Sequence, residues 1–226
     1  MKDFRATMEE IGTPQDCSRL WQYGIETYED LLALAEGEHD VDLRRSACWY
    51  LARLGGERAF TAFARCLEAE EERVRCGAAL SLGELGGEQA MERLIQCLEA
   101  DPDADVRWFA AHGLGEIGDK RAFVALRTVL RRSEEDPRVR GMAAEALAYI
   151  GDRRGVGELV KVLGDPSPEL RYWVVFALGQ IGNASLIPKL LPMLEDHAST
   201  PEFGSVADEV AATIEILKEK EGENGG

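Results

Sequence analysis

A motif that returns five times constrains the fold of this chain more than any other feature of its sequence. A glycine recurs at separations of 31, 32, 33 and 31 residues, and an arginine stands eleven residues before each copy. The glycines are Gly55, Gly86, Gly118, Gly151 and Gly182, and the arginines are Arg44, Arg75, Arg107, Arg140 and Arg171. A fixed period of this length is typical of solenoids, in which each unit buries its apolar face against its neighbours.

Apolar residues between the arginine and the glycine are spaced as on one face of a helix, and a second, shorter periodic segment follows each glycine. Around the third copy these residues are Val106, Ala110, Leu114 and Ile117, followed by Phe123, Leu126, Val129 and Leu130. Each unit is therefore predicted to be a helical hairpin. We call the helix that carries the arginine and the glycine the motif helix.

Capping residues mark the predicted helix ends. Four motif helices are expected to begin behind a polar side chain that accepts a backbone hydrogen bond. These residues are Asp40, Asp103, Asp136 and Ser167. Pro137 and Pro168 take the first helical position, where a missing N–H costs nothing, and the recurrent glycine suits a left-handed helix end. Thr27 and Asp30 resemble a capping box with Asp in place of the usual Glu.

The predicted fold class is all-α: an α-solenoid, or superhelix, of about six helical hairpins. Residues 1–26 are expected to form a helical cap with a helix start at Thr13-Pro14, and residues 221–226 a disordered tail. The repeats are predicted at 27–55, 56–86, 87–118, 119–151, 152–182 and 183–220. The sixth has a longer loop, from Glu195 to Gly204, and lacks both the arginine and the closing glycine, as terminal repeats often do.

The repeats resemble HEAT repeats, and more closely the short HEAT-like repeat of phycobilisome (bilin) lyases. The residues that carry the resemblance are Asp101-Pro-Asp-Ala-Asp-Val-Arg107, Ala110-Ala111 and Leu114-Gly-Glu-Ile-Gly-Asp119. It extends from residue 27 to about residue 218 and is specific for the fold, since the same repeat serves many functions.

The resemblance also implies a ladder of ion pairs between the recurrent arginines and an acid near the end of each first helix. The matching acids are Glu38, Asp101, Glu134 and Asp165. Ala69 occupies the equivalent position in the second repeat and is expected to break the series. Such a ladder serves every repeat alike, so the arginines are interpreted as structural.

The chain is strongly acidic, with 26 Lys and Arg against 42 Asp and Glu and a formal net charge of −16. Nucleic acid would be repelled unless basic residues gathered on one face, and no Lys/Arg run indicates such a face. An acidic exterior suits solubility or a basic partner. We expect no nucleic-acid partner.

The chain is predicted to be soluble and cytoplasmic, with no membrane partner. Its first ten residues lack the apolar core of a secretory signal. The longest uncharged run, from Tyr172 to Pro188, is better explained as a repeat in register than as a membrane span, because Gln180, Gly182 and Asn183 interrupt it.

Five cysteines, an odd number without a C-x-x-C pair, do not indicate a disulfide framework or a zinc site. Cys66 and Cys97 take the repeat position held elsewhere by Val129, Val162 and Met193, so they are interpreted as small core hydrophobes. The chain has only three histidines. No metal site and no cofactor is predicted.

A candidate binding surface lies on the motif helices. When the first apolar residue of each is counted as zero, positions two, six and ten form a stripe away from the hairpin's core, and the resemblance implies that this motif-helix stripe lines a concave surface. Its predicted partner-binding residues are Arg45, Trp49, Arg53, Trp108, His112, Glu116, Glu145, Tyr149, Tyr172 and Phe176. The stripe also includes Cys76, Leu80, Glu84, Gly141 and Gln180. Contiguous exposed apolar residues mark binding surfaces, and Trp and Tyr commonly anchor them.

Position three carries Phe109, Met142 and Trp173, which are interpreted as packing residues because they lie beside the core face. His112 and Glu116, one turn apart, allow two interpretations, an acid/base pair or a polar rim around the aromatic residues. With no nucleophile or second histidine nearby, the rim is favoured. No catalytic residue is predicted.

The favoured interpretation is a non-enzymatic scaffold or adaptor that binds a protein partner on its aromatic concave face. The alternative is a bilin lyase-like protein or chaperone that binds an open-chain tetrapyrrole or a phycobiliprotein. In that case Trp49, Trp108 or Trp173 would stack on the pigment and Arg45 or Arg53 would pair with a propionate. A di-iron hydroxylase built from similar repeats is excluded, because its His-Glu pairs are missing from these motif helices.

Overall fold

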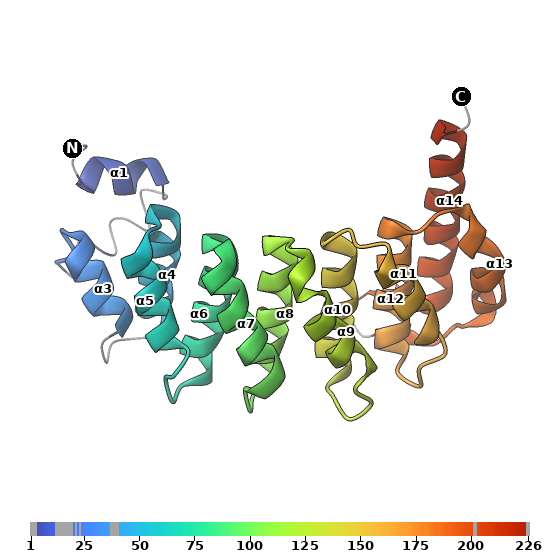
Figure 1. Cartoon of the computed structure of the whole chain (residues 1–226), viewed down its shortest axis with the longest axis horizontal. Coiled ribbons are helices and arrows are strands. Elements are labelled where there is room, and N and C mark those ends of the chain that lie inside the picture. Colours follow the sequence, from blue (N-terminus) through green and yellow to red (C-terminus); the bar gives the residue numbers. More distant parts are fainter. Residues whose placement is uncertain are drawn as a thin grey trace. The chain divides into compact units, whose positions relative to one another are not determined.

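Paired helices account for most of the chain, as the periodicity predicts. The computed structural model describes residues 4–11, 20, 22, 24–36, 41–200 and 203–224 (Figure 1). The fold is all-α, of the α-solenoid class, and it divides into two compact units, residues 1–113 and 114–226. Each unit is described by itself. The predicted division into cap, six-hairpin solenoid and tail stays a prediction.

The N-terminal unit begins with a short helix and continues with helices in pairs (Figure 1). They are α1 (Phe4–Ile11), α3 (Tyr28–Glu36), α4 (Val41–Leu54), α5 (Glu57–Cys66), α6 (Glu72–Leu85), α7 (Gly87–Ala100) and α8 (Ala104–Ile117), of which the last continues past the end of the unit. The motif helix α4 packs against α3, α5 and α6, and α6 packs against α5 and α7. Leu51, Phe63 and Leu82 are fully buried between these helices.

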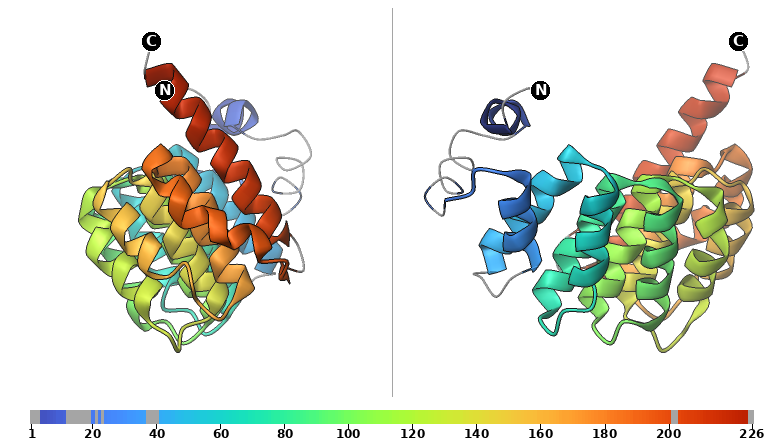
Figure 2. Two further views of the ribbon diagram at one scale, coloured as in Figure 1. Left: turned by 90° about the vertical axis from the view of Figure 1, so that its right-hand side faces the viewer. Right: turned by 60° about the vertical axis from the view of Figure 1, so that its left-hand side comes forward.

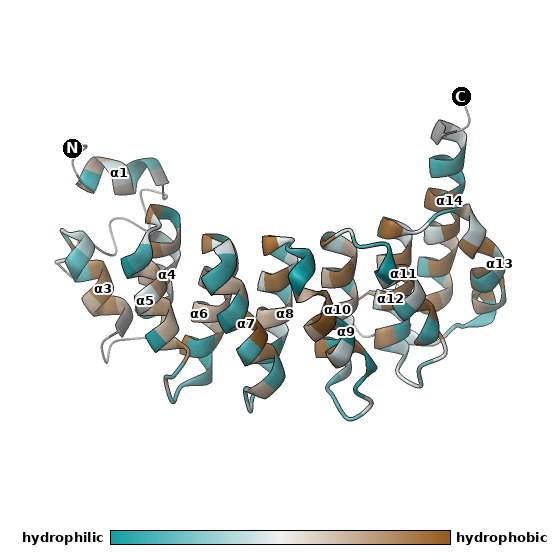
Figure 3. Cartoon of the chain, viewed as in Figure 1, coloured by the Kyte–Doolittle hydropathy of each residue, from teal (hydrophilic) through white to brown (hydrophobic). Residues whose placement is uncertain are grey.

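The C-terminal unit repeats this arrangement with shorter outer helices (Figures 1 and 2). Its elements are η1 (Lys120–Ala122), α9 (Phe123–Arg131), α10 (Pro137–Tyr149), α11 (Arg154–Lys161), α12 (Pro168–Ile181), η2 (Ala184–Leu186), α13 (Ile187–Leu190), η3 (Leu191–Glu195), β1 (Ser199–Thr200), β2 (Gly204–Ser205) and α14 (Val206–Asn224). The helices α10, α12 and α14 pack side by side. The loops after α5 and after α9 are largely hydrophilic (Figure 3).

The last hairpin differs from the others in two ways. The predicted long loop contains a two-stranded antiparallel ribbon, in which Ser199 lies opposite Ser205 and Thr200 opposite Gly204. The helix α14 also continues to Asn224, into the segment predicted as a tail. Glu and Lys favour helix here, and Lys220 donates from Nζ to two carbonyls at the end of α12, each at 2.7 Å.

Several predicted caps are confirmed. Thr27 and Asp30 form a reciprocal capping box, in which the Asp30 amide donates to Thr27 Oγ1 (3.2 Å) and the Thr27 amide donates to Asp30 Oδ2 (2.8 Å). The Asp136 carboxylate accepts from the Arg138 amide, and Ser167 Oγ from the Leu170 amide. Asp40 and the predicted start at Thr13-Pro14 lie outside the described residues.

The recurrent glycine follows four motif helices with a positive φ, which favours glycine: Gly55, Gly86, Gly118 and Gly151 have φ of 71°, 71°, 69° and 62°. The prediction is wrong for Gly182, which has φ −83° and ψ −178°. The chain turns there directly into η2, and a Cβ on Gly182 would collide with the Leu186 side chain. Glycine at this position therefore allows close packing and not a left-handed turn.

The ion-pair ladder is present, but Arg75, Arg140 and Arg171 each take their acid from the following repeat. Within the N-terminal unit Arg75 pairs with Asp101 (2.9 Å). The equivalent acid for Arg44 would stand at position 69, and Arg44 instead lies 3.8 Å from the exposed Glu71, so Ala69 breaks the series as predicted. Within the C-terminal unit Arg140 pairs with Asp165 (2.7 Å) and Arg171 with Asp196 (2.7 Å).

Of the predicted acids, Asp101 and Asp165 are confirmed and Glu134 is wrong. Glu134 is exposed and accepts a hydrogen bond from Ser133, whereas Asp196, which was not predicted, takes part in the ladder. Glu38 lies outside the described residues. Each arginine also bonds carbonyls nearby, as Arg171 Nη1 does with the Asp165 oxygen (2.7 Å). The arginines thus tie the loop between two helices to the next hairpin.

The four cysteines in the described residues are free thiols, and three of them are buried. Burial raises the pKa of the Cys97 thiol to about 11, which makes it a poor nucleophile. This agrees with the interpretation as core hydrophobes for Cys66, which is 2% exposed, while Cys97 is only half-buried. Cys17 lies outside the described residues.

Candidate functional site

The motif-helix stripe of the N-terminal unit starts with an aromatic ring that already holds a cation. The guanidinium carbon of Arg53 lies 4.3 Å from the ring centroid of Trp49, one helical turn before it on α4. The indole also meets the buried Tyr50 edge-on, with ring centroids 4.9 Å apart. Trp49 is half-buried and Arg53 exposed, so the pair lies at the surface of the unit. The Arg45 side chain lies outside the described part of the structure.

Beside Trp49 a pocket of about 380 Å³ opens between α4 and α6. Its lining residues are Ser46, Trp49, Tyr50, Gly77, Leu80, Ser81 and Glu84. Leu80 and Glu84 belong to the motif-helix stripe but were not among the predicted binding residues. Both line the pocket together with Trp49, which was a predicted binding residue.

Trp108 and His112 stack on each other on α8, with ring centroids 5.7 Å apart and ring planes inclined by 16°. The edge of Phe109 meets the Trp108 ring at 5.0 Å. Nδ1 of His112 is buried and makes no hydrogen bond within the described residues. His112 is thus a member of an aromatic stack, and the choice between a polar rim and an acid/base pair stays a prediction.

On α10 of the C-terminal unit, Tyr149 is 51% exposed while Glu145, one turn earlier, is buried. The Tyr149 hydroxyl donates to Glu145 Oε1 at 2.9 Å. This hydrogen bond and burial raise the pKa of the tyrosine, and the charge of Glu116 adds to the effect. The structure therefore places three predicted residues close together, as a phenol held by one carboxylate near a second.

Four aromatic side chains form a cluster on α12 and the ribbon. Tyr172 stacks on Phe203 with centroids 5.5 Å apart, and Trp173 meets Phe203 at 4.9 Å and Phe176 at 5.7 Å. Phe203 is 41% exposed and covers part of the predicted face of α12. We call these four residues the α12 cluster.

Position three of the motif helices is less buried than predicted. Met142 is 6% exposed and is a packing residue, but Phe109 and Trp173 are only half-buried. Trp173 lies against Gly141, where a Cβ would come within 2.7 Å of the indole. Gly141, a stripe residue without a side chain, therefore leaves the space into which the Trp173 indole packs.

Glu209 of α14 holds the hydroxyl of Tyr172 and was missed by sequence reasoning. Burial and the Glu209 carboxylate raise the pKa of Tyr172 to about 12. Burial also raises the pKa of Glu209, against the opposing effect of hydrogen bonds from Tyr172 and Thr213. No sequence signal indicated Phe203 or Glu209, because Phe203 lies in a loop whose path the repeat period does not define and Glu209 follows that loop.

Replacing Glu209 with glutamine is expected to make the protein less sensitive to rising pH. The folded-state pKa of Glu209 lies above its ordinary value, so its ionisation costs stability as the pH rises from that value through the raised one. Below this window both folded and unfolded states hold the proton and the cost is absent. Urea unfolding at about pH 4 and about pH 7 should show Glu209→Gln gaining stability relative to wild type at the higher pH.

Glu215→Gln is the matched control, since Glu215 is exposed on the same helix. It should leave the pH dependence of unfolding as in wild type. An equal gain at both pH values in Glu209→Gln would contradict the assignment of a raised pKa.

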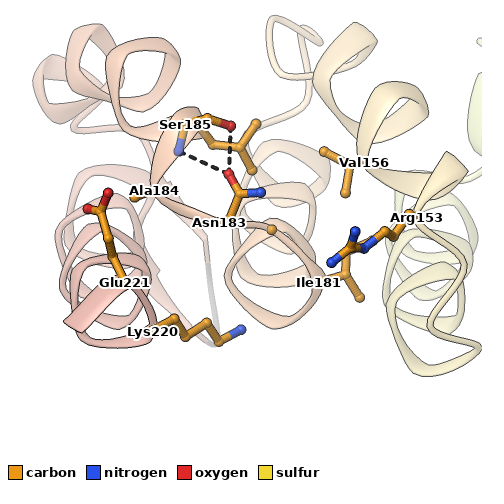
Figure 4. Close-up of a pocket in the computed structure, with 10 residues that line it drawn as sticks. Arg153, Val156, Ile181, Asn183, Ala184, Ser185, Lys220 and Glu221 are labelled. Atoms are coloured by element: carbon orange, nitrogen blue, oxygen red, sulfur yellow. Dashed lines mark hydrogen bonds between the residues drawn. The ribbon is translucent and has the colours of Figure 1, made fainter. Parts of the chain in front are cut away.

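A larger pocket of about 750 Å³ lies elsewhere in the C-terminal unit and is lined by Arg153, Lys220 and the residues at the start of η2 (Figure 4). Its polar groups are largely engaged. The side-chain oxygen of Asn183 accepts from the Ser185 amide (3.0 Å) and hydroxyl (2.6 Å), and Lys220 caps α12. None of the predicted site residues lines this pocket.

Within the residues that the structure describes, no group of three or more His, Cys, Asp or Glu side chains is arranged to hold a metal ion. No helix of that same part of the chain has the length and apolar character needed to cross a bilayer.

The comparisons with known proteins agree with the α-solenoid fold. The family model of HEAT repeats matches residues 28–108, 91–156 and 128–215. The structure of YibA from E. coli is similar in fold, with 18% identity and a TM-score of 0.63 over 92% of this chain and 79% of that one. A designed armadillo repeat protein in complex with the peptide (KR)4 has 21% identity and a TM-score of 0.50 over 82% of this chain and 98% of that one.

The complex of CpcE and CpcF of phycocyanin lyase from Nostoc sp. PCC7120 also matches, with 25% identity and a TM-score of 0.47 over 84% of this chain and 94% of that chain. No curated protein sequence matches the chain.

Proposed function

We propose that this chain, which belongs to the HEAT-repeat family, is a non-enzymatic scaffold that binds a protein partner through its motif-helix stripe. The observation that carries the proposal is the recurrence of accessible aromatic rings beside carboxylates on the motif helices. Trp49 lies near Glu84 in one unit, and Tyr149 is bonded to Glu145 in the other. Tyr and Trp are the side chains that most often dominate the binding energy of protein interfaces.

Tyr149 has the properties of an interface anchor. Its ring is 51% exposed, yet its hydroxyl is fixed by Glu145, so little side-chain freedom is lost when a partner covers it. The half-buried ring of Phe176 extends the apolar surface on α12. A ring that is held in place and open to solvent suits binding better than catalysis.

The chemistry of the surface favours a basic partner. The chain carries a formal net charge of −16, which attracts cations over a distance. A designed armadillo protein of similar fold is in complex with the basic peptide (KR)4. That likeness concerns the fold, and the charge of this chain is what supports the same choice here.

The alternative partner, an open-chain tetrapyrrole, needs indole faces free for stacking. Arg53 already lies over Trp49 and His112 over Trp108. A pigment would therefore compete with these side chains for an indole face or be left with the opposite one, so the arrangement favours a protein partner. Titration with bilins, followed by visible absorbance, tests this, since a spectral change at micromolar pigment would restore the alternative.

A photocrosslinking amino acid at position 149 is expected to capture the partner in lysate of the native host. The matched control places the same group at position 124, because Val124 is 56% exposed on the outer helix α9. Mass spectrometry should identify a protein that is joined to the Tyr149 variant and not to the Val124 variant. Capture by the Val124 variant alone would place the interface on the outer helices and overturn the proposal.

A further inference from the structure

We infer that the pocket between α4 and α6 binds a lysine or arginine side chain of the protein partner, with its aliphatic stem against Trp49 and Leu80 and its charged head beside Glu84. The inference rests on the proposed function and names the chemistry that one part of the motif-helix stripe recognises. It uses only residues of the N-terminal unit.

The walls of the pocket fit a long aliphatic stem. Trp49 and Leu80 are half-buried, so each keeps apolar surface open to the cavity. Gly77 lines the pocket without a side chain, which leaves room that any other residue would fill. Lys and Arg bury their methylene stems along apolar surfaces of this kind while the charged end stays near water.

The polar end of the pocket fits a cation. Glu84 is exposed and is the one charged residue among the described residues that line the pocket. An apolar side chain of the partner would bury this carboxylate without a partner, at a cost in free energy, and an acidic one would be repelled. A cation instead gains a charge-assisted hydrogen bond.

Trp49 itself accepts a cation in this structure. Arg53 places its guanidinium 4.3 Å from the ring centroid, within the range at which the ring quadrupole attracts positive charge. The intramolecular contact shows which chemistry the indole accommodates. A partner's cation in the pocket would either use the rest of the indole surface or replace Arg53.

Carboxylates close to the pocket also favour the binding of a cation. Cys76 lies on the same stripe of α6 as Leu80 and Glu84. Burial raises the pKa of its thiol to about 12, and the carboxylates of Glu72 and Asp105 contribute next, ahead of the opposing Arg75. At Cys76, therefore, the effect of the neighbouring carboxylates exceeds that of Arg75.

The test is fluorescence anisotropy of a labelled octapeptide of alternating glycine and lysine, compared with the same peptide carrying acetyl-lysine. Acetylation keeps the stem and removes the charge. The full-length wild type is expected to bind the lysine peptide about tenfold more tightly than the acetylated one, the size of one good charge-assisted contact. Glu84→Gln and Trp49→Ala should each weaken binding of the lysine peptide by about tenfold.

Glu92→Gln is the matched control, because it removes the same charge from an exposed position of the neighbouring helix α7. Its affinity should stay within about twofold of wild type, as expected for a remote surface charge. Arg53→Ala should bind the lysine peptide at least as tightly as wild type, since it frees the indole face.

Equal losses in Glu84→Gln and Glu92→Gln would mean general charge attraction and overturn the inference, as would equal affinity for the two peptides. Absence of binding by wild type would overturn it as well. The proposed function fails separately, because crosslinking at Tyr149 tests the other unit and does not depend on this pocket.

Discussion

Replacing Arg75 with alanine is expected to lower the free energy of unfolding by about 3 to 5 kcal/mol, the cost of breaking a buried ion pair by removing one partner. Nε of Arg75 lies 2.9 Å from Asp101 Oδ2, and only 9% and 7% of the two side chains are exposed. Nη1 also donates to the carbonyls of Ala69 and Glu70, each at 2.9 Å, and Nη2 pairs with Asp103.

The alanine variant leaves the Asp101 carboxylate buried without its cation and two loop carbonyls without their donor. Unpaired buried charge is among the most expensive defects in a folded protein. The effect should appear as a lower midpoint in guanidinium unfolding, with the slope close to that of wild type.

Arg93→Ala is the matched control. Arg93 pairs with Glu68 at 3.2 Å, but 33% and 74% of these side chains are exposed. Exposed pairs contribute at most about 1 kcal/mol. If both variants lost the same free energy of unfolding, burial would not explain the contribution of the Arg75–Asp101 pair to stability.

Gly83→Ala is expected to destabilise the protein by about 2 kcal/mol, although alanine usually favours a helix. A Cβ at residue 83 would lie 2.6 Å from the Cα of Gly113, so the backbones of α6 and α8 touch at this pair of glycines. The obstacle is main chain and not a flexible side chain. The two helices must separate, which also opens gaps among their neighbours.

Gly157→Ala makes the same chemical change without the collision, since no atom lies within 4 Å of a Cβ built there. Gly157 is exposed within α11, so alanine should stabilise the protein by up to about 1 kcal/mol. Thermal unfolding of the two variants should therefore shift in opposite directions. A stabilised Gly83→Ala variant would refute the close backbone contact.

The sequence predicts the fold well because the period, the helix caps and the apolar spacing repeat. A signal that occurs five times is hard to misread, and the helices end where the recurrent glycines predict. The helix α12 also ends just before its glycine, but Gly182 lacks the positive φ of the other four, because the residues that follow it turn at once into η2 and bring Leu186 into close contact.

The ladder and the site were less predictable, because both depend on contacts between residues far apart in the chain. Arg75 and Asp101 are 26 residues apart, and no local pattern states which repeat supplies the acid. The α12 cluster includes Phe203 from a loop that occurs once. Stripe residues such as Tyr149 follow from helical spacing, while the pocket beside Glu84 depends on how two helices meet.

The forward pairing of the arginines also bears on how such a chain can lengthen. The hairpin of residues 152–182 offers a carboxylate, Asp165, to the one before it and an arginine, Arg171, to the one after it. A tandem duplication of a whole hairpin copies both groups, so the new copy finds partners on either side. The final hairpin keeps the carboxylate, Asp196, but has no arginine at the position that Arg171 holds in the hairpin before it.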